Sequence, residues 1–391
     1  MYNLKYINGR KFVNKNINIT VNKKECMGCG LCAFVCPVRA IHLINDEEGF
    51  QIPYVDEKRC IECGKCIRKC PVNEQNEQTS NTKYVLAAQL KDEDRLNKSA
   101  SGGAFYGIAM GFITAGGRVF GVVDDAVRGS FFCEATTRED IDRMVGSKYY
   151  QCNLNENIYE TIKVRIREKK NVLFIGTPCQ VKAVINSIPE KEQKYLYTID
   201  IICQGVPSRK IVNLYHEYIY KKYGKRVEEH YYRSKEKIQK GDYTTKLVFS
   251  DKSFKIIEGQ DDLYTRSFSR KLFLRESCYS CKFTNLNRKS DITIGDFWGI
   301  KEIKSLSEEK GISLVLINSK KGQEIFDSVV DKFNIESRKL EDALPYNLPL
   351  TQCASRKWYR NISYRMLNIL GFAKTTQVLC FKYYIKKIIR R

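Results

Sequence analysis

Two cysteine runs near the start of the chain constrain its fold more than any other feature of the sequence. Both follow the pattern C-x-x-C-x-x-C-x-x-x-C-P, and each run is closed by a proline, Pro37 or Pro71. The eight cysteines are Cys26, Cys29, Cys32 and Cys36 in the first run and Cys60, Cys63, Cys66 and Cys70 in the second. Eight thiols at a repeated spacing indicate a small unit built around bound inorganic groups rather than around a large apolar core.

This spacing suits a pair of 4Fe–4S clusters, because three corners of each cube must be held by one tight loop. Gly28, Gly30 and Gly64 allow the backbone to curl so that N–H groups face the sulfurs. The last cysteine of each run lies too far along the chain to close the same cluster, and in chains with this run it ligates the other one. One predicted cluster therefore uses Cys26, Cys29, Cys32 and Cys70, and the other uses Cys60, Cys63, Cys66 and Cys36.

Two zinc knuckles or a disulfide scaffold are the alternatives for these cysteines. Zinc sites seldom include a third cysteine at this position with a trailing Cys-Pro. Disulfides require an oxidising compartment, and nothing else in the sequence supports one. The sequence therefore favours iron–sulfur clusters.

The cellular location follows from what the sequence lacks. The N-terminus, MYNLKYINGRKFVNKN, has no apolar core of a secretory signal, and the chain has no 18-residue apolar run that could span a bilayer. We therefore expect a protein of the reducing cytoplasm, which also suits oxygen-sensitive clusters.

Nearly half of the net charge of +22 lies in the last forty-nine residues. From Ala343 to Arg391 there is no Asp or Glu, and ten cations are present: Arg356, Lys357, Arg360, Arg365, Lys374, Lys382, Lys386, Lys387, Arg390 and Arg391. No nucleic-acid-binding motif accompanies this charge, so we expect no nucleic-acid partner. An acidic electron carrier such as ferredoxin or flavodoxin, or an anionic membrane surface at the inner face of the membrane, is the better match. A solvated basic helix is the equally open alternative.

The order of patterns predicts an α+β ferredoxin-like N-terminal unit followed by an α/β region with one or more mixed sheets. A buried strand over 171–176, a helix over 181–187 and a strand over 195–203 form a βαβ unit. Further strands are expected over 83–90, 118–123, 131–135, 291–299 and 313–318, and helices over 104–115, 137–144, 156–169, from 209 and over 322–333. The segments expected are a lead-in over 1–22, the ferredoxin unit over 23–72, a linker over 73–82, α/β regions over 83–200 and 201–342, and a basic amphipathic tail over 343–391.

A second set of cysteines lies at strand ends and in a short loop: Cys179, Cys203, Cys278 and Cys281. The carboxyl ends of neighbouring parallel strands meet at one edge of a sheet, where cofactors bind. These four thiols are therefore candidates for a third cluster or a zinc ion, although isolated cysteines are more often small buried apolar residues. We interpret Cys133, Cys152, Cys353 and Cys380 in that second way.

The turn from Ser99 to Gly103 opens an apolar helix, and such turns present free N–H groups and a positive dipole to a diphosphate. Most short Ser-Gly-Gly turns bind nothing, and this one is not the G-x-G-x-x-G of a Rossmann site. Only His42, His216 and His230 occur, so histidine metal sites and catalytic triads are poorly supported.

Taken in order, the motifs resemble the beta subunits of coenzyme F420 hydrogenases and dehydrogenases, and the related plant hydroxymethyl-chlorophyll reductase. The resemblance rests on the ferredoxin run and on SASGGAFYGIA, GSKYYQ, GTPCQVKAV, CQGVPS, CYSC and DITIGDFWG. It ends near Gly299 and leaves the basic tail outside.

This resemblance implies a flavoprotein whose clusters pass electrons to FAD on the α/β region. It places Ser101, Gly102 and Gly103 at the FAD phosphates, and Lys148, Tyr149 and Thr177 around the flavin. It also implies a third 4Fe–4S cluster on the second cysteine set, with Asp296 and Trp298 beside that cluster or the flavin, or in a purely structural turn. Use of coenzyme F420 itself stays open.

Two functions remain as hypotheses. The first is an iron–sulfur flavoenzyme that passes electrons between a ferredoxin-type carrier and an organic acceptor. The second is a non-catalytic electron-transfer subunit of a larger redox complex with a partner oxidoreductase subunit, with a link to polysaccharide biosynthesis. The sequence names no catalytic residue for either.

Overall fold

The computed structural model describes residues 24–73, 81–125, 128–236 and 243–381, together with the backbone of two short strands. These strands, β1 (Lys5–Ile7) and β2 (Arg10–Phe12), pair antiparallel. Apart from these two strands, the predicted lead-in lies outside the described residues, as do most of the predicted linker and the last five cations of the predicted tail.

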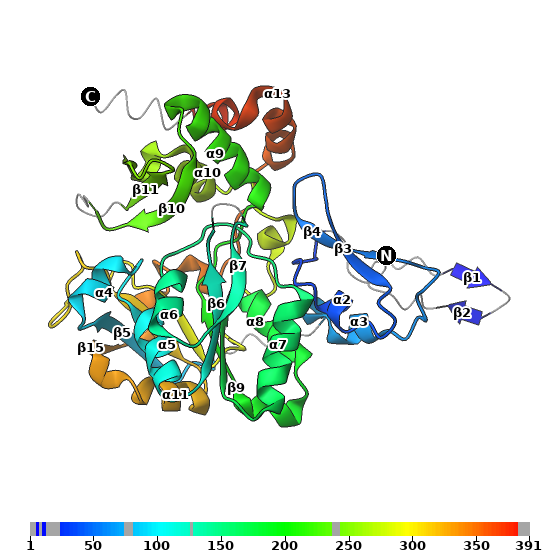
Figure 1. Ribbon diagram of the computed structural model, residues 1–391, viewed down its shortest axis with the longest axis horizontal. Helices are drawn as coiled ribbons and strands as arrows, with labels where there is room; N and C mark the ends of the chain where they lie inside the picture. Colours follow the sequence, from blue (N-terminus) through cyan, green and yellow to red (C-terminus); the bar gives the residue numbers. More distant parts are fainter. Residues whose placement is uncertain are drawn as a thin grey trace.

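The ferredoxin unit consists of α2 (Leu31–Phe34), the antiparallel pair β3 (Ile41–Asn45) and β4 (Gln51–Val55), and α3 (Lys65–Lys69). Each short helix begins after a glycine in the left-handed region, Gly30 with φ 74° and Gly64 with φ 67°. This conformation suits glycine, which has no Cβ to clash. The unit projects from one side of the molecule (Figure 1).

A single eight-stranded mixed sheet forms the centre of the molecule, in the order β15-β5-β14-β13-β9-β8-β6-β7. Strands β6, β8, β9 and β13 are parallel, and β7, β14, β5 and β15 each pair antiparallel to a neighbour. In chain order the strands are β5 (Tyr84–Leu90), β6 (Arg118–Val123), β7 (Phe131–Ala135), β8 (Val172–Gly176), β9 (Leu196–Ile201), β13 (Ile292–Asp296), β14 (Ser313–Ile317) and β15 (Phe333–Arg338).

Helices cover both faces of this sheet, so its strands are apolar on both sides. On one face, α5 (Ala104–Thr114), α6 (Arg138–Met144) and α11 (Lys320–Asp327) pack on the sheet, with Leu96 of α4 (Glu93–Lys98) in the same core. On the other face lie α7 (Glu156–Arg167) and α8 (Pro178–Ser187), whose core also includes Leu31 of the ferredoxin unit. The loop region around α12 (Leu340–Ala343) covers the rest of that face.

A second module is inserted between β9 and β13. It contains α9 (Arg209–Tyr223), the antiparallel strands β10 (Val227–Ser234), β11 (Thr244–Phe249) and β12 (Phe254–Glu258), and α10 (Leu263–Ser269). The last helix, α13 (Arg360–Leu379), returns to pack in the core of this module. Figure 1 shows the module at the top of the view, above the sheet.

The fold class expected from the sequence, a ferredoxin-like unit followed by a mixed α/β sheet, is confirmed. Two segment boundaries differ from expectation. Strand β13 pairs in register with β9, so a division at 200/201 would cut one sheet in two. Residues 360–379 are a packed helix with Arg360 buried, and this part of 343–391 is therefore not a free basic tail.

Several element ends also differ from expectation. The helix expected over 322–333 ends at Asp327, because Phe333 begins β15, an edge strand that the sequence pattern did not reveal. Strand β9 ends at Ile201, two residues before Cys203, and α8 begins at Pro178, before the expected Val181. Among the described residues, no helix is long and apolar enough to cross a membrane.

Candidate redox centres and cofactor cavity

The thiols of Cys26, Cys29, Cys32 and Cys70 lie within electrostatic reach of one another. Burial is the main cause that raises the pKa of Cys29, Cys32 and Cys70, the last to about 11, and neighbouring thiols of the set raise it further. Three of these thiols belong to the first cysteine run and Cys70 closes the second, as crossed ligation of two clusters requires.

The remaining four cysteines of the ferredoxin unit surround a small cavity of about 20 Å³. Cys36, Cys60, Cys63 and Cys66 line it, with Ile61 beside them. Cys63 is exposed and Ile61 has 60% of its surface exposed, so this site lies at the outside of the molecule. The other site faces inward, toward α7 and α8.

Buried polar contacts hold the ferredoxin unit against the sheet. The Arg275 guanidinium donates to the Cys26 carbonyl at 2.7 Å, the Gln51 carbonyl at 2.8 Å and the Gln151 side chain at 3.1 Å. The approach is so close that a Cβ on Gly28 would lie 2.7 Å from this guanidinium. The Tyr159 hydroxyl of α7 donates to the Cys29 carbonyl at 2.9 Å.

A second tie reaches the ferredoxin unit from the end of the described chain. Arg360, at the start of α13, donates to both carboxylate oxygens of Glu48 in the β3–β4 turn, at 2.9 and 2.7 Å. The Ser208 hydroxyl donates to the Glu48 carbonyl at 2.6 Å. The ferredoxin unit is therefore docked by both the inserted module and the last helix.

The second cysteine set converges at the carboxyl edge of the sheet. Cys179 lies in the first turn of α8, Cys203 follows β9, Cys278 lies in the short 3-10 helix Glu276–Ser280, and Cys281 comes directly after it. All four line one cavity. Burial, followed by the other thiols of the set, raises the pKa of Cys179 to about 11 and that of Cys203 to about 12.

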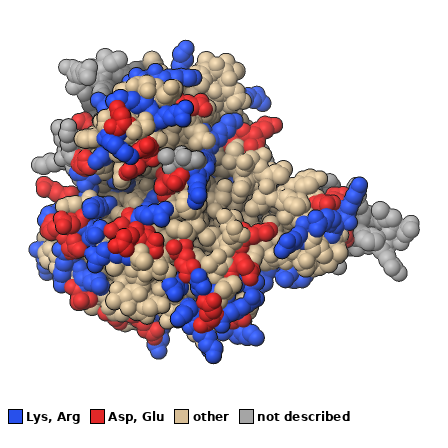
Figure 2. Space-filling view, in the orientation of Figure 1, with Lys and Arg blue, Asp and Glu red and all other residues tan. Residues whose placement is uncertain are grey.

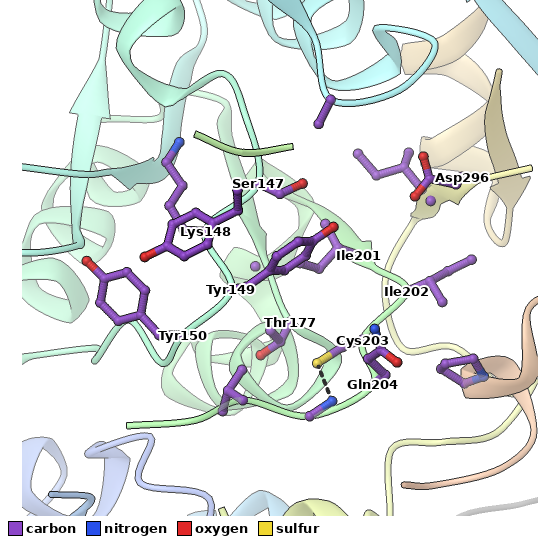
Figure 3. Close-up of a pocket in the computed structure, with 18 of the residues that line it drawn as sticks. Ser147, Lys148, Tyr149, Tyr150, Thr177, Ile201, Ile202, Cys203, Gln204 and Asp296 are labelled. Atoms are coloured by element: carbon purple, nitrogen blue, oxygen red, sulfur yellow. Dashed lines mark hydrogen bonds between the residues drawn. The ribbon is translucent and has the colours of Figure 1, made fainter. Parts of the chain in front are cut away.

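Backbone donors also face this set, as they do around cluster sulfurs. The Gly205 N–H donates to Cys203 Sγ at 3.4 Å, which is the dashed line in Figure 3. Thr177 Oγ1 lies 3.2 Å from Cys179 Sγ. No group of three or more His, Cys, Asp or Glu side chains within the described ranges is arranged to hold a metal ion.

The two cysteine sets are neighbours. Cys179 is one of the thiols that raise the pKa of Cys29, after burial and the larger effects of Cys70 and Cys26. Burial raises the pKa of Tyr159, and Cys29, Cys32 and, to a smaller extent, Cys179 raise it further. The Tyr159 hydroxyl donates to the Cys29 carbonyl. The inward site of the ferredoxin unit therefore lies beside the cavity edge.

The cavity has a volume of about 700 Å³, within the usual range for cofactor and small-molecule sites. It lies between the sheet edge and the inserted module, and Figure 2 shows a hollow between these two parts. Of the site residues predicted from the sequence, the following line it: Ser101, Gly103, Lys148, Tyr149, Thr177, Asp296 and Trp298.

Gly102 is the predicted residue that is not in this lining. A Cβ on Gly102 would lie 2.3 Å from the Ala88 carbonyl oxygen and 2.4 Å from the Ser313 nitrogen, so the glycine allows the loop to pass between β5 and β14. The next residue, Gly103, has φ 82° and precedes α5, whose first turn opens into the cavity. The Ser101 hydroxyl is already engaged, because it donates to the Ile312 carbonyl at 3.0 Å.

The GSKYYQ loop places three consecutive side chains in different environments, as Figure 3 shows. The Lys148 ammonium donates to the carbonyls of Met144 and Val145 at 2.7 and 3.0 Å, and burial lowers its pKa to about 8. The Tyr149 ring stacks on Phe268 of α10 at 4.7 Å between centroids. The Tyr150 hydroxyl donates to Asp124 at 2.5 Å, just beyond β6.

Sequence reasoning missed several residues of this site. Arg233 and Tyr243 reach the cavity from the inserted module, Arg275 reaches it beside Cys278, and Cys152, interpreted as an inert thiol, also lines it. No local motif marks any of them, because each is brought in by tertiary packing. Of the other three dispersed thiols, Cys353 Sγ donates to the Tyr279 carbonyl at 3.1 Å, Cys380 is buried in the second module, and Cys133 is half-buried on β7.

Two regions of the chain match known families. Residues 169–343 match the family described as the C terminus of the coenzyme F420 hydrogenase/dehydrogenase beta subunit. Residues 25–73 match a 4Fe-4S dicluster domain, and a second dicluster description matches residues 52–100. The loops with Ser101–Gly103 and Lys148–Tyr149 lie between the matched ranges.

No curated protein matches the chain. Thirteen chains of solved structures do. One of them belongs to a xenon-derivatised F420-reducing [NiFe] hydrogenase complex from Methanosarcina barkeri. It is 18% identical, with a TM-score of 0.47, and the match covers 70% of this chain and 87% of that one.

Proposed function

Because residues 169–343 match the C-terminal family of coenzyme F420 hydrogenase/dehydrogenase beta subunits and residues 25–73 match a 4Fe–4S dicluster domain, we propose that this chain is an iron–sulfur flavoprotein oxidoreductase. It passes electrons between a ferredoxin-type carrier and an organic acceptor. The observation that carries the proposal is the second cysteine set, which lines a large cavity and lies beside the inward site of the ferredoxin unit.

The positions of the thiols support a route from the surface to the cavity. The site with the exposed Cys63 is open to a carrier, and the site with Cys29 lies deeper, against α7 and α8. Cys179 follows next and already belongs to the cavity wall. The four thiols of each set match the number of cysteines that a 4Fe–4S cluster requires.

The cavity residues fit a flavin nucleotide. Its wall is mostly apolar, and the first turns of α5 and α8 both open into it, so two helix N-termini supply N–H groups and positive dipoles for phosphates. Tyr149 offers an aromatic wall. When bound, a flavin exchanges electrons singly with clusters and in pairs with an organic molecule.

The chain's own residues position these groups. Arg275 holds the Cys26 loop, the Gln51 carbonyl and Gln151 in fixed relation to the cavity. Capping of α8 by Thr177 and Gln180 fixes the turn that carries Cys179, because the Thr177 N–H donates to Gln180 Oε1 at 3.0 Å. Gln180 in turn donates to the Cys152 carbonyl at 2.7 Å, which ties α8 to the GSKYYQ loop.

Anaerobic purification followed by an ultraviolet-visible spectrum and by flavin and iron analysis tests the proposal. We expect one flavin and about twelve irons per chain, four for each cluster. A preparation with about eight irons and no flavin, after reconstitution with iron, sulfide and FAD under nitrogen, would contradict it. That result would support a non-catalytic electron-transfer subunit.

A further inference from the structure

Four side chains form a polar and aromatic part of the cavity wall: Arg233, Tyr243, Asp296 and Trp298. Arg233 lies on β10 of the inserted module and Asp296 ends β13 of the sheet, so the pair bridges the two sides of the cavity. Arg233 Nη1 donates to Asp296 Oδ2 in a short contact. The two side chains are 6% and 19% exposed.

This ion pair leaves hydrogen-bonding groups unused. Arg233 Nε and Nη2, and Asp296 Oδ1, are buried without a partner among the described residues. Nε and Nη2 share one edge of the planar guanidinium, and that edge matches the two oxygens of a carboxylate. Buried donors without partners cost free energy, which a bound anion would offset.

Other buried arginines of the chain do not show this pattern. Arg275, Arg288 and Arg360 each use Nε, Nη1 and Nη2 in hydrogen bonds to protein oxygens. These three arginines are structural ties. The Arg233 side chain is 6% exposed and lines the cavity, yet its Nε and Nη2 have no partner among the described residues.

Three neighbouring side chains limit the directions from which a ligand can approach Arg233. The Tyr243 ring covers one face of the guanidinium at 3.5 Å from its centroid, which leaves the edge as the polar contact. Trp298 lies 5.4 Å from Arg233 and is 40% exposed, so it offers an apolar surface beside that edge. Lys235, whose ammonium donates to the Ser101 carbonyl at 2.8 Å, adds a second positive charge nearby.

We propose that Arg233 and Asp296 form the subsite for the carboxylate of the organic substrate, and that this substrate is a small hydroxycarboxylate as electron donor, or the corresponding oxo acid as electron acceptor. The carboxylate takes the Nε–Nη2 edge, and the neighbouring hydroxyl donates to Asp296 Oδ1. This assignment rests on the proposed function, since it names the substrate class of the same cavity.

Calorimetric titration of the anaerobic holoprotein tests the subsite with tartronate, malonate, inorganic phosphate and uncharged malonamide. We expect tartronate to bind best, malonate more weakly because it has no hydroxyl, and malonamide not at all. Arg233→Lys removes the two-donor edge and weakens tartronate binding about tenfold. Arg338→Lys is the matched control, because Arg338 also pairs closely with a carboxylate and has a buried unpaired Nε but lies outside the cavity wall.

A second variant keeps the test decisive if Arg233→Lys does not fold. Asp296→Asn keeps the shape of the side chain and removes a negative charge beside the incoming anion. We therefore expect malonate to bind severalfold more tightly, and an unchanged affinity for malonate overturns the subsite. Failure of tartronate and malonate to bind the unaltered protein also overturns it. So does tighter binding of phosphate than of tartronate, or loss of flavin from Arg233→Lys alone, because the edge would then hold a cofactor phosphate.

The two proposals fail in different ways. Arg233-dependent tartronate binding to a preparation that takes up no flavin would sustain the subsite and reject the flavoenzyme. A flavin-containing protein that binds none of the carboxylates would reject the subsite and leave the flavoenzyme standing.

Discussion

The ferredoxin unit and the cavity edge each gather cysteines, but they do so by different means. In the ferredoxin unit, the thiols follow one another within short loops, and glycines such as Gly30 and Gly64 set the curl of the backbone. At the cavity edge, a helix start, a strand end and a short 3-10 helix each bring one or two thiols from distant parts of the sequence. The first arrangement is encoded locally, and the second depends on the whole sheet being formed.

The comparison predicts the largest effect for a thiol of the inward ferredoxin site. Cys32→Ser removes one corner of a cluster, and we expect a loss of about four irons per chain together with loss of electron delivery to the cavity. Iron analysis and low-temperature electron paramagnetic resonance measure it. Cys353→Ser, at an exposed thiol outside both sets, serves as the control and keeps full iron. If Cys32→Ser retains all its iron, Cys32 does not differ from Cys353 in iron binding.

A thiol of the cavity edge should give a more selective loss. Cys203→Ser is expected to lose about four irons while the signals of the two ferredoxin clusters persist, because those loops form independently of the sheet edge. The same two measurements apply. Cys380→Ser changes a thiol buried in the second module, away from the cavity, and should keep its iron. If Cys203→Ser retains as much iron as Cys380→Ser, no third cluster is bound there.

The connection between the two regions can be weakened without touching a thiol. Arg275→Met leaves the carbonyls of Cys26 and Gln51 and the Gln151 side chain without their donor, and we expect a loss of about 3 kcal/mol in the free energy of unfolding. Urea denaturation under nitrogen measures this loss. Arg356→Met breaks the pair with Glu276, where Arg356 is 36% exposed, and is expected to cost about 0.5 kcal/mol. If the two variants lose the same free energy of unfolding, Arg275 does not hold the ferredoxin unit against the sheet.

The smallest effect concerns pH and the loop that contacts both regions. Burial lowers the pKa of Lys148 from 10.5 to about 8, so between these values the unfolded chain holds more protons than the folded one. The free energy of unfolding therefore gains a contribution as pH rises through this window, of about 2 kcal/mol. Lys148→Met lacks this contribution. Urea denaturation should show that the free energy of unfolding of the wild type rises, relative to that of the variant, between about pH 7 and about pH 10. If both proteins change equally with pH, the Lys148 ammonium is in contact with water.

The sequence was sufficient wherever a local pattern determines structure. Most of the expected strands and helices are present, among them β6, which matches its expected limits, and α6, whose capping box at Thr137 and Asp140 is formed. The ferredoxin spacing led to the dicluster domain. These predictions depend on periodicity, capping residues and turn glycines, which act over a few neighbouring positions.

Long-range packing accounts for what could not be predicted. Strand β15 pairs with β5, far away in the chain, and its burial does not alternate: Asn334, Ile335 and Ser337 are exposed, as residues of a loop or helix end would be. Arg360 looked like one cation of a basic tail, yet its guanidinium is buried against Glu48, whose identity as a partner is visible only in three dimensions. No sequence motif marks Arg233. Its place in the cavity wall depends on contacts with Tyr243 and with Asp296 on another strand.

The tie between Arg360 and Glu48 also bears on how the protein is assembled on the ribosome. The cysteines of the ferredoxin unit leave the ribosome long before Arg275 and Arg360, which complete its docking. Until these arginines have been made, the hydrogen bonds that dock the ferredoxin unit against the rest of the molecule cannot form. We therefore expect cluster insertion to be easiest before the last helix packs.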